Sequence, residues 1–156
     1  MAMSDFRKRE GEIHLNIEEV EEVHTKPVLE YLNNPQNIDV EMNSCDGKGQ
    51  VSARSKKWKA TIWICLKIRE DRIWKATWFA TGIGGLITAY GSALTEMVTW
   101  ETIRDAFWIR PEEISASLDL PETGFGAWVK RALVAAITNY NIYKSAPWKR
   151  MYEQKY

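Results

Sequence analysis

Apolar and polar residues alternate along residues 50–81, as they do in strands that bury one face. Within the segment Trp58–Ile68, for example, Ile62 and Ile64 fall on one side and Trp63 falls on the other. A charged turn at residues 69–72 separates this segment from the next one. The pattern predicts three consecutive antiparallel strands, at residues 50–54, 58–68 and 73–81.

From Gly82 onward the apolar residues recur every three or four positions, which is the spacing of amphipathic helices. Pro111 suits the first turn of one such helix, and Thr99 is predicted to cap another. An earlier helix begins at Pro27, with Thr25 as its cap. The predicted helices cover residues 27–33, 86–98, 100–107, 111–118 and 128–143. Strands followed by helices predict an α+β fold, a short three-stranded antiparallel sheet covered on one face by helices.

The two ends of the chain differ in composition from the segment between them. Residues 1–25 form a charge-rich arm, residues 26–143 form the predicted domain, and residues 144–156 form a basic and aromatic tail. In the arm, Ile13, Leu15 and Ile17 alternate as in a strand. Ile17, Val20 and Val23 fit one face of a short helix equally well. The sequence leaves both interpretations of the arm open.

Composition narrows the range of partners. The formal net charge is zero, with 21 basic and 21 acidic residues, so no global field attracts nucleic acid or an anionic membrane, and we predict neither as a partner. No apolar run reaches the roughly 18 residues of a membrane span. The polar N-terminus lacks the apolar core of a secretory signal, and two cysteines are too few for a disulfide framework. These features predict a cytoplasmic protein.

Several short motifs occur in an order that is informative as a set. Asn34-Pro35-Gln36-Asn37-Ile38 follows the first predicted helix, and Leu120-Pro121 precedes the last one. Between them lie Gly49, Phe79, Thr81, Ser92, Thr95, Glu96 and Val98. In this order the motifs resemble the U-type iron–sulfur cluster assembly scaffolds, the family of IscU and the N-terminal part of NifU. The resemblance covers roughly three quarters of the chain and implies the same α+β fold.

The resemblance also shows where this chain departs from the family, whose cluster is held by cysteines on three loops. Trp58-Lys59-Ala60 falls on the family's Cys-Gly-Asp tip, and Gly84 falls on its second cysteine. Gly126-Ala127 or Gly124-Phe125 falls on its His-Cys pair. Thiolate, imidazole and carboxylate groups hold iron or zinc, whereas indole and glycine do not. We therefore predict no metal, cluster or other cofactor at these positions.

The remaining metal-binding residue types are few. Cys65 lies inside the second predicted strand and is interpreted as a buried apolar thiol, and Cys45 lies in a loop that is interpreted as exposed. His14 and His24 are the only imidazoles, and both lie in the N-terminal arm. An alternative function follows from these residues, a cluster or metal carrier with unconventional or partner-supplied ligands.

A further alternative is a small-ligand-binding or enzymatic subunit. Its pocket would be roofed by Trp58 and Trp128, and Lys59 or Arg131 would meet an anionic ligand. No nucleophile–base pair is recognisable in the sequence, so we predict no catalytic residues and no catalysis by the chain alone.

The eight tryptophans favour a different function. If the three family loops converge, Trp58, Lys59 and Gly84 meet Phe125 or Trp128 in an aromatic patch that either packs on itself or anchors another protein. Together with Trp148 in the tail, these residues are the predicted partner-binding set. The favoured function is a non-catalytic, scaffold-derived protein that serves as a structural or accessory subunit through contacts with a protein partner.

Overall fold

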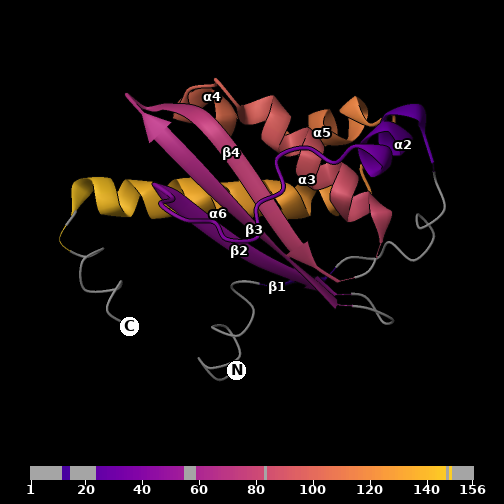
Figure 1. Ribbon diagram of the computed structural model, residues 1–156, viewed down its shortest axis with the longest axis horizontal. Helices are drawn as coiled ribbons and strands as arrows, with labels where there is room; N and C mark the ends of the chain where they lie inside the picture. The colour runs from indigo at the N-terminus through magenta and orange to yellow at the C-terminus, as the bar shows by residue number, and fades with distance from the viewer. Residues whose placement is uncertain (1–11, 15–23, 55–58, 83, 147, 149–156) are drawn as a thin grey trace.

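The computed structural model describes residues 12–14, 24–54, 59–82, 84–146 and 148. Its three long strands, β2 (Gly47–Arg54), β3 (Lys59–Arg69) and β4 (Arg72–Thr81), form the predicted antiparallel meander (Figure 1). Opposite pairs such as Val51↔Ile62 and Ile64↔Trp78 place the buried positions of neighbouring strands on one face. The alternation seen in the sequence therefore fixes the register of the sheet.

A fourth strand extends the sheet beyond the predicted three. Strand β1 (Glu12–His14) pairs in parallel with β2, with Ile13 opposite Ala53, and gives the strand order β1-β2-β3-β4. Of the two interpretations of the N-terminal arm, the strand holds for these three residues. The possible helix through Ile17, Val20 and Val23 lies outside the described residues. The proposed domain boundaries stay a prediction.

Five helices follow the predicted pattern closely. They are α2 (Lys26–Asn33), α3 (Gly85–Val98), α4 (Ile103–Phe107), α5 (Pro111–Ser117) and α6 (Phe125–Ser145). The hydroxyl of Thr25 accepts a hydrogen bond from the Val28 N–H, as an N-cap should. The prediction for Thr99 is wrong, because Thr99 ends α3 and its hydroxyl donates to the Thr95 carbonyl at 2.6 Å. Thr102 caps α4 instead.

The helices cover one face of the sheet, and the core lies between the two layers (Figure 1). Ile62, Ile64 and Leu66 point from β3 into this core and are fully buried. Two glycines of β2 let the long helix approach closely: a Cβ on Gly49 would lie 2.3 Å from the Ala132 carbonyl oxygen, and one on Gly47 would lie 2.4 Å from that of Ala136. Helix α6 therefore packs directly on the β2 backbone.

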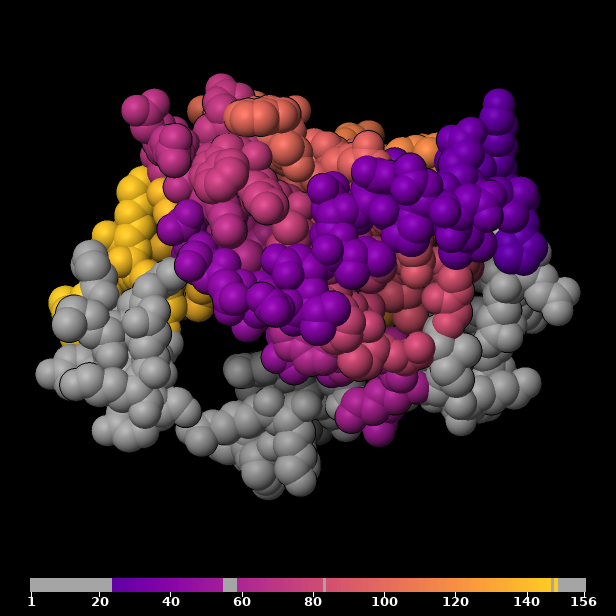
Figure 2. All heavy atoms as spheres, viewed as in Figure 1, coloured from indigo at the N-terminus to yellow at the C-terminus, as the bar shows by residue number. Residues whose placement is uncertain are grey.

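The chain crosses the other face of the sheet between α2 and β2. Residues 38–46, called the strap from here on, begin at the outer edge of β4, where the Asp39 N–H donates to the Trp78 carbonyl at 3.0 Å. The strap ends where the Asp46 N–H donates to the Leu66 carbonyl of β3 at 2.8 Å. Figures 1 and 2 show it lying in front of the strands, opposite the helical layer. Met42, which belongs to the strap, is buried.

Candidate functional site

The end of the sheet where β3 begins and β4 stops carries two of the family's ligand positions. Gly82 packs against Ala60, since a Cβ on Gly82 would lie 2.5 Å from the Ala60 Cβ, so the start of β3 and the end of β4 lie side by side. Lys59 and Gly84 are both exposed, and a Cβ on Gly84 would meet no heavy atom within 4 Å. Trp58 lies outside the described residues. At these described positions the chain presents an ammonium group and bare backbone.

Phe125 and Trp128 are in the core rather than on a surface. Trp128 is fully buried, and its indole Nε1 donates to the Val51 carbonyl of β2 at 3.1 Å. Phe125 is 5% exposed and stacks on Tyr90 of α3 with ring centroids 5.3 Å apart. For these two rings the patch packs on itself, which corrects the expectation that they face a partner. Nor can Trp128 roof a ligand pocket.

Glu122 is a site residue that the sequence analysis missed. Its carboxylate accepts hydrogen bonds from the N–H groups of Gly124, Gly126 and Ala127, at 3.3, 2.9 and 2.7 Å. A negative charge at the start of a helix is favourable, because the first N–H groups there have no partner within the helix. Glu122 therefore satisfies the α6 N-terminus at the place where the resemblance puts the family's last ligands. The sequence signal for this role is an acidic residue, Glu122, two positions before Gly124, which precedes the helix.

A buried polar pair links this loop to the core. The Tyr90 and Ser115 hydroxyls lie 2.7 Å apart, and the Ser115 hydroxyl also lies 3.0 Å from Glu122 Oε1. Burial raises the pKa of Tyr90 to about 12, because the phenolate would be poorly solvated, and the carboxylate of Glu122 adds to this effect.

The raised pKa of Tyr90 predicts a loss of stability in alkali. Below the unfolded-state pKa of about 10, Tyr90 is protonated in both states. Between that value and about 12 the folded protein holds the proton more tightly, so its stability falls as the pH rises. We expect the free energy of unfolding, measured by urea titration at stepped pH, to drop more steeply in the wild type than in Tyr90→Phe. Parallel pH profiles would contradict the assignment.

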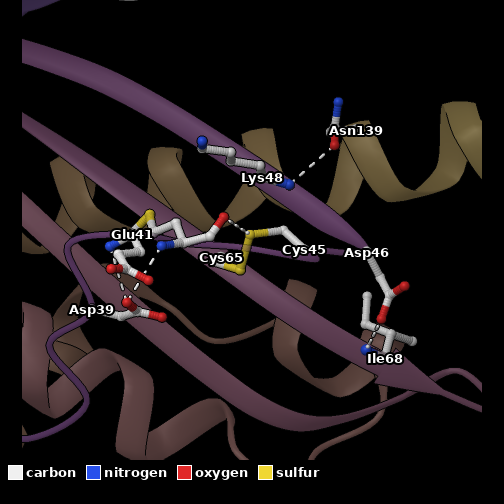
Figure 3. The surroundings of a disulfide bond; sticks show 9 residues. Asp39, Glu41, Cys45, Asp46, Lys48, Cys65, Ile68 and Asn139 are labelled. Carbon is white, nitrogen blue, oxygen red and sulfur yellow. Dashed lines mark hydrogen bonds between the residues drawn. A yellow bond between two sulfur atoms is a disulfide. The ribbon is translucent and has the colours of Figure 1, made fainter. Parts of the chain in front are cut away.

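The two cysteines are joined in a disulfide, with their Cα atoms 5.4 Å apart (Figure 3). Cys65 is 1% exposed, so its predicted burial is confirmed, but the interpretation as a free thiol is wrong. Cys45, which the sequence places in a loop, is bonded to Cys65 on the strand beneath the strap. The strap brings them together by crossing the sheet. Neither sulfur is therefore a thiolate available to a metal while the bond is intact.

The donor set at the ligand end does not fit an iron–sulfur cluster. Among the described residues at this end, Lys59, Ala60 and the glycines at 82, 84 and 85 supply no thiolate, imidazole or carboxylate, and the Glu122 carboxylate is held by the α6 N-terminus. Among the described residues no group of three or more His, Cys, Asp or Glu is placed to share a metal ion. His24 is exposed at the start of α2, and the side chain of His14 is not among those described.

Three exposed aromatic side chains lie at the opposite end of the sheet, on the side of the β3–β4 turn. Trp100 is 64% exposed, Trp108 is 69% exposed and Phe107 is 43% exposed. The connection from α3 to α4 is fixed against the turn, since the Trp100 N–H donates to the Ile73 carbonyl and the Ile103 N–H donates to that of Asp71. Strand β3 spans roughly 33 Å, so this end is far from the ligand end.

A groove of about 390 Å³ is lined by Phe107 and Trp108 together with Ile103 and Ile137. Lys144 closes one side, where its Nζ lies 2.7 Å from Asp71 Oδ1, and the Tyr140 hydroxyl donates to the same oxygen. These hydrogen bonds lower the pKa of Asp71, so its carboxylate is ionised near neutral pH. The groove is thus lined by apolar, aromatic and charged side chains. We call Trp100, Phe107 and Trp108 the exposed aromatic cluster.

The decisive comparison is with protein families. The family described as "NifU-like N terminal domain" matches residues 23–146, most of the chain. The chain belongs to this family. The matched residues include all five helices and the three long strands, so the predicted α+β fold and the family resemblance are both confirmed. In this NifU-like chain, the resemblance places the family's ligand positions at Trp58, at Gly84 and at Gly126-Ala127 or Gly124-Phe125, and Trp58 lies outside the described residues.

Solved structures of low sequence identity resemble this NifU-like chain. A candidate iron–sulfur cluster assembly scaffold protein for the SUF system from Fervidobacterium islandicum AW-1 is 9% identical, with 76% of this chain and 94% of that chain covered and a TM-score of 0.48. A NifU-like N-terminal protein from Brucella abortus is 21% identical, with coverages of 88% and 99% and a TM-score of 0.44. Comparison with curated proteins gives no significant match. No helix in the described part of the chain could cross a membrane.

Proposed function

We propose that this NifU-like chain is a structural or accessory subunit that acts through protein–protein contacts and does not itself hold a cluster at the family's ligand loops. The donor set at those loops supports the second half of the proposal. The observation that carries the first half is the exposed aromatic cluster, because tryptophans that fold into no core are typical centres of protein interfaces.

The backbone at Trp100 adds to this argument. Its φ is +73°, a left-handed conformation that bulky residues adopt at a cost of about 1–3 kcal/mol. A side chain held this way and yet 64% exposed contributes little core packing in return. Such strain persists where the surroundings enforce it, and it clusters at binding sites. We therefore assign the cluster and the groove beside it as the main contact surface for the partner.

The originally predicted partner-binding residues keep a smaller part in the proposal. The exposed residues of the set remain proposed contacts: Lys59, Gly84 and Trp148. Trp58, which precedes Lys59 in the sequence, remains a proposed contact as well. Phe125 and Trp128 leave the set because they are buried. The proposed cytoplasmic location is opposed by the Cys45–Cys65 disulfide, since such bonds persist mainly in oxidising compartments. Fractionation of source cells, with the thiols alkylated at lysis, tests both the cytoplasmic location and the presence of the disulfide.

Substitution in the exposed aromatic cluster should release the partner. We expect the tagged full-length chain to co-purify from its source cells with one protein in fixed stoichiometry, measured by native mass spectrometry. Trp108→Ala should weaken this association about tenfold or more, because a central interface tryptophan contributes at least about 2 kcal/mol. Val40→Ala is the control, as Val40 is an apolar side chain that is 68% exposed but lies on the strap. A wild-type chain that stays monomeric in extract would overturn the proposal, and loss of the partner by Val40→Ala alone would move the contact surface.

A further inference from the structure

Positive and negative charges balance over the whole chain, but they do not balance over strands β2, β3 and β4. Strands β2, β3 and β4 contain no Asp or Glu at all. They carry seven of the chain's 21 basic residues: Lys48, Arg54, Lys59, Lys67, Arg69, Arg72 and Lys75. Side chains alternate along a strand, and the positions between these bases are the buried ones that face the helices. Most of these bases therefore lie on the face away from the helical layer.

Aromatic rings lie among these bases. Trp63 and Phe79 are opposite each other on the two central strands, with ring centroids 5.8 Å apart, and both keep part of their surface exposed. Farther along the same strands, Trp74 is 36% exposed, and Lys67 Nζ and Arg69 Cζ lie 5.9 and 5.6 Å from its ring. The open face thus combines flat π surfaces with cationic groups.

The strap covers only part of this face. Cys65 and Thr77, the row next to the Trp63–Phe79 pair, are buried, whereas the pair itself is not. The strap carries three acids, Asp39, Glu41 and Asp46, and two of them accept hydrogen bonds from nearby backbone. Asp39 Oδ1 accepts from the Glu41 and Met42 N–H groups, and Asp46 Oδ2 accepts from the Ile68 N–H at 2.8 Å (Figure 3). The disulfide holds this arrangement in place.

We propose that the open face of the sheet binds single-stranded nucleic acid, with bases stacked on Trp63 and Phe79 and phosphates held by Lys59, Lys67 and Lys75. Stacking is available to any unpaired base, and a row of lysines along a strand follows a phosphate backbone. An acidic protein segment would match the charge but leaves the paired rings without a role. Lys59 and Lys67 lie about 26 Å apart along β3, a path of about four nucleotides, and the strap crosses this path at Cys65, so the nucleic acid passes over the strap between the stacked rings and Lys67.

This inference goes beyond the proposed function and uses a different surface from the exposed aromatic cluster. The expectation that nucleic acid is not a partner came from a net charge of zero. A net charge describes the far field of a protein, whereas phosphates close to the surface respond to the local arrangement of charges. Because basic residues are concentrated on one face of the sheet, a net charge of zero does not exclude nucleic acid as a partner.

The test is fluorescence anisotropy of a labelled oligouridine of about 12 nucleotides with the full-length chain. We expect micromolar binding at about 50 mM salt that weakens markedly by about 200 mM. Lys67→Glu/Lys75→Glu and Trp63→Leu should each weaken binding about tenfold or more. The matched control is Lys26→Glu/Arg104→Glu, which reverses two exposed charges on α2 and α4 and should bind like the wild type. Thermal unfolding of each variant shows that it is folded.

Three results would overturn the proposal. The first is no binding by the wild type at low salt. The second is equal weakening by the sheet and control charge reversals, which would mean that only total charge matters. The third is unchanged affinity of folded Trp63→Leu together with equal competition by polyglutamate of the same charge, which would make the face a site for acidic protein segments. Duplex RNA of the same length should compete poorly, because its bases are not free to stack.

Discussion

Replacing Trp128 by alanine should lower the free energy of unfolding by about 3–5 kcal/mol, the range for deletion of a large aromatic side chain from a core. Trp128 is fully buried between α6 and β2, and its indole N–H bonds the Val51 carbonyl, which the substitution would leave without that donor. The measurement is equilibrium urea unfolding followed by circular dichroism, with the slope of the transition checked for two-state behaviour.

The control for this experiment is Trp108→Ala. Trp108 is 69% exposed, so the same chemical change there should alter the stability of the isolated chain by no more than about 0.5 kcal/mol. The pair of variants separates tryptophans that build the fold from tryptophans offered to a partner. If Trp128→Ala were as stable as Trp108→Ala, the account of the ligand end as a packed aromatic core would be wrong.

Reduction of the Cys45–Cys65 disulfide should lower the free energy of unfolding by about 3 kcal/mol. The bond closes a loop with a sequence separation of 20, and the loss of that restraint frees the unfolded chain. For a chain of this size, such a change lowers the melting temperature by about 6–12 °C. Calorimetry of the oxidised and reduced protein measures the shift, and alkylation followed by mass spectrometry counts the thiols in each sample.

The double variant Cys45→Ser/Cys65→Ser is the control for the reductant. Its melting temperature should be low and should not respond to a dithiol, since it has no bond to reduce. Equal melting temperatures of oxidised and reduced wild type would show that the strap holds its place without the bond. Two alkylated cysteines in protein taken from cells under acid quench would show that the bond does not form there.

Local patterns were sufficient to predict most of the fold. The Thr25 cap and the proline at Pro27 act within one helical turn, and Asn34-Pro35 ends the same helix by local sterics. The period-2 alternation around Ile62 and Ile64 placed the strands to within a few residues. Thr99 was misassigned because Thr99 and Thr102 both precede an apolar run, and only the fixed connection to Ile73 selects Thr102 as the cap.

The features that the sequence did not reveal depend on long-range topology. Cys45 meets Cys65 only because the strap crosses the sheet from β4 to β2, and no local pattern specifies that crossing. Tryptophan is compatible with both core and interface, so the type alone could not assign Trp128 to one and Trp108 to the other. The absence of family ligands at Trp58 and Gly84 was readable directly, because it depends on residue identity and not on packing.

The central claim is that this NifU-like chain lacks the ligands to hold an iron–sulfur cluster by itself. Its most direct test is anaerobic reconstitution of the purified chain with iron and sulfide, in oxidised and reduced form, followed by desalting, visible absorbance and metal analysis. The account predicts no retained iron in either form beyond that of a boiled sample. Stoichiometric iron and sulfide on the chain alone, with the absorbance of a cluster, would contradict it.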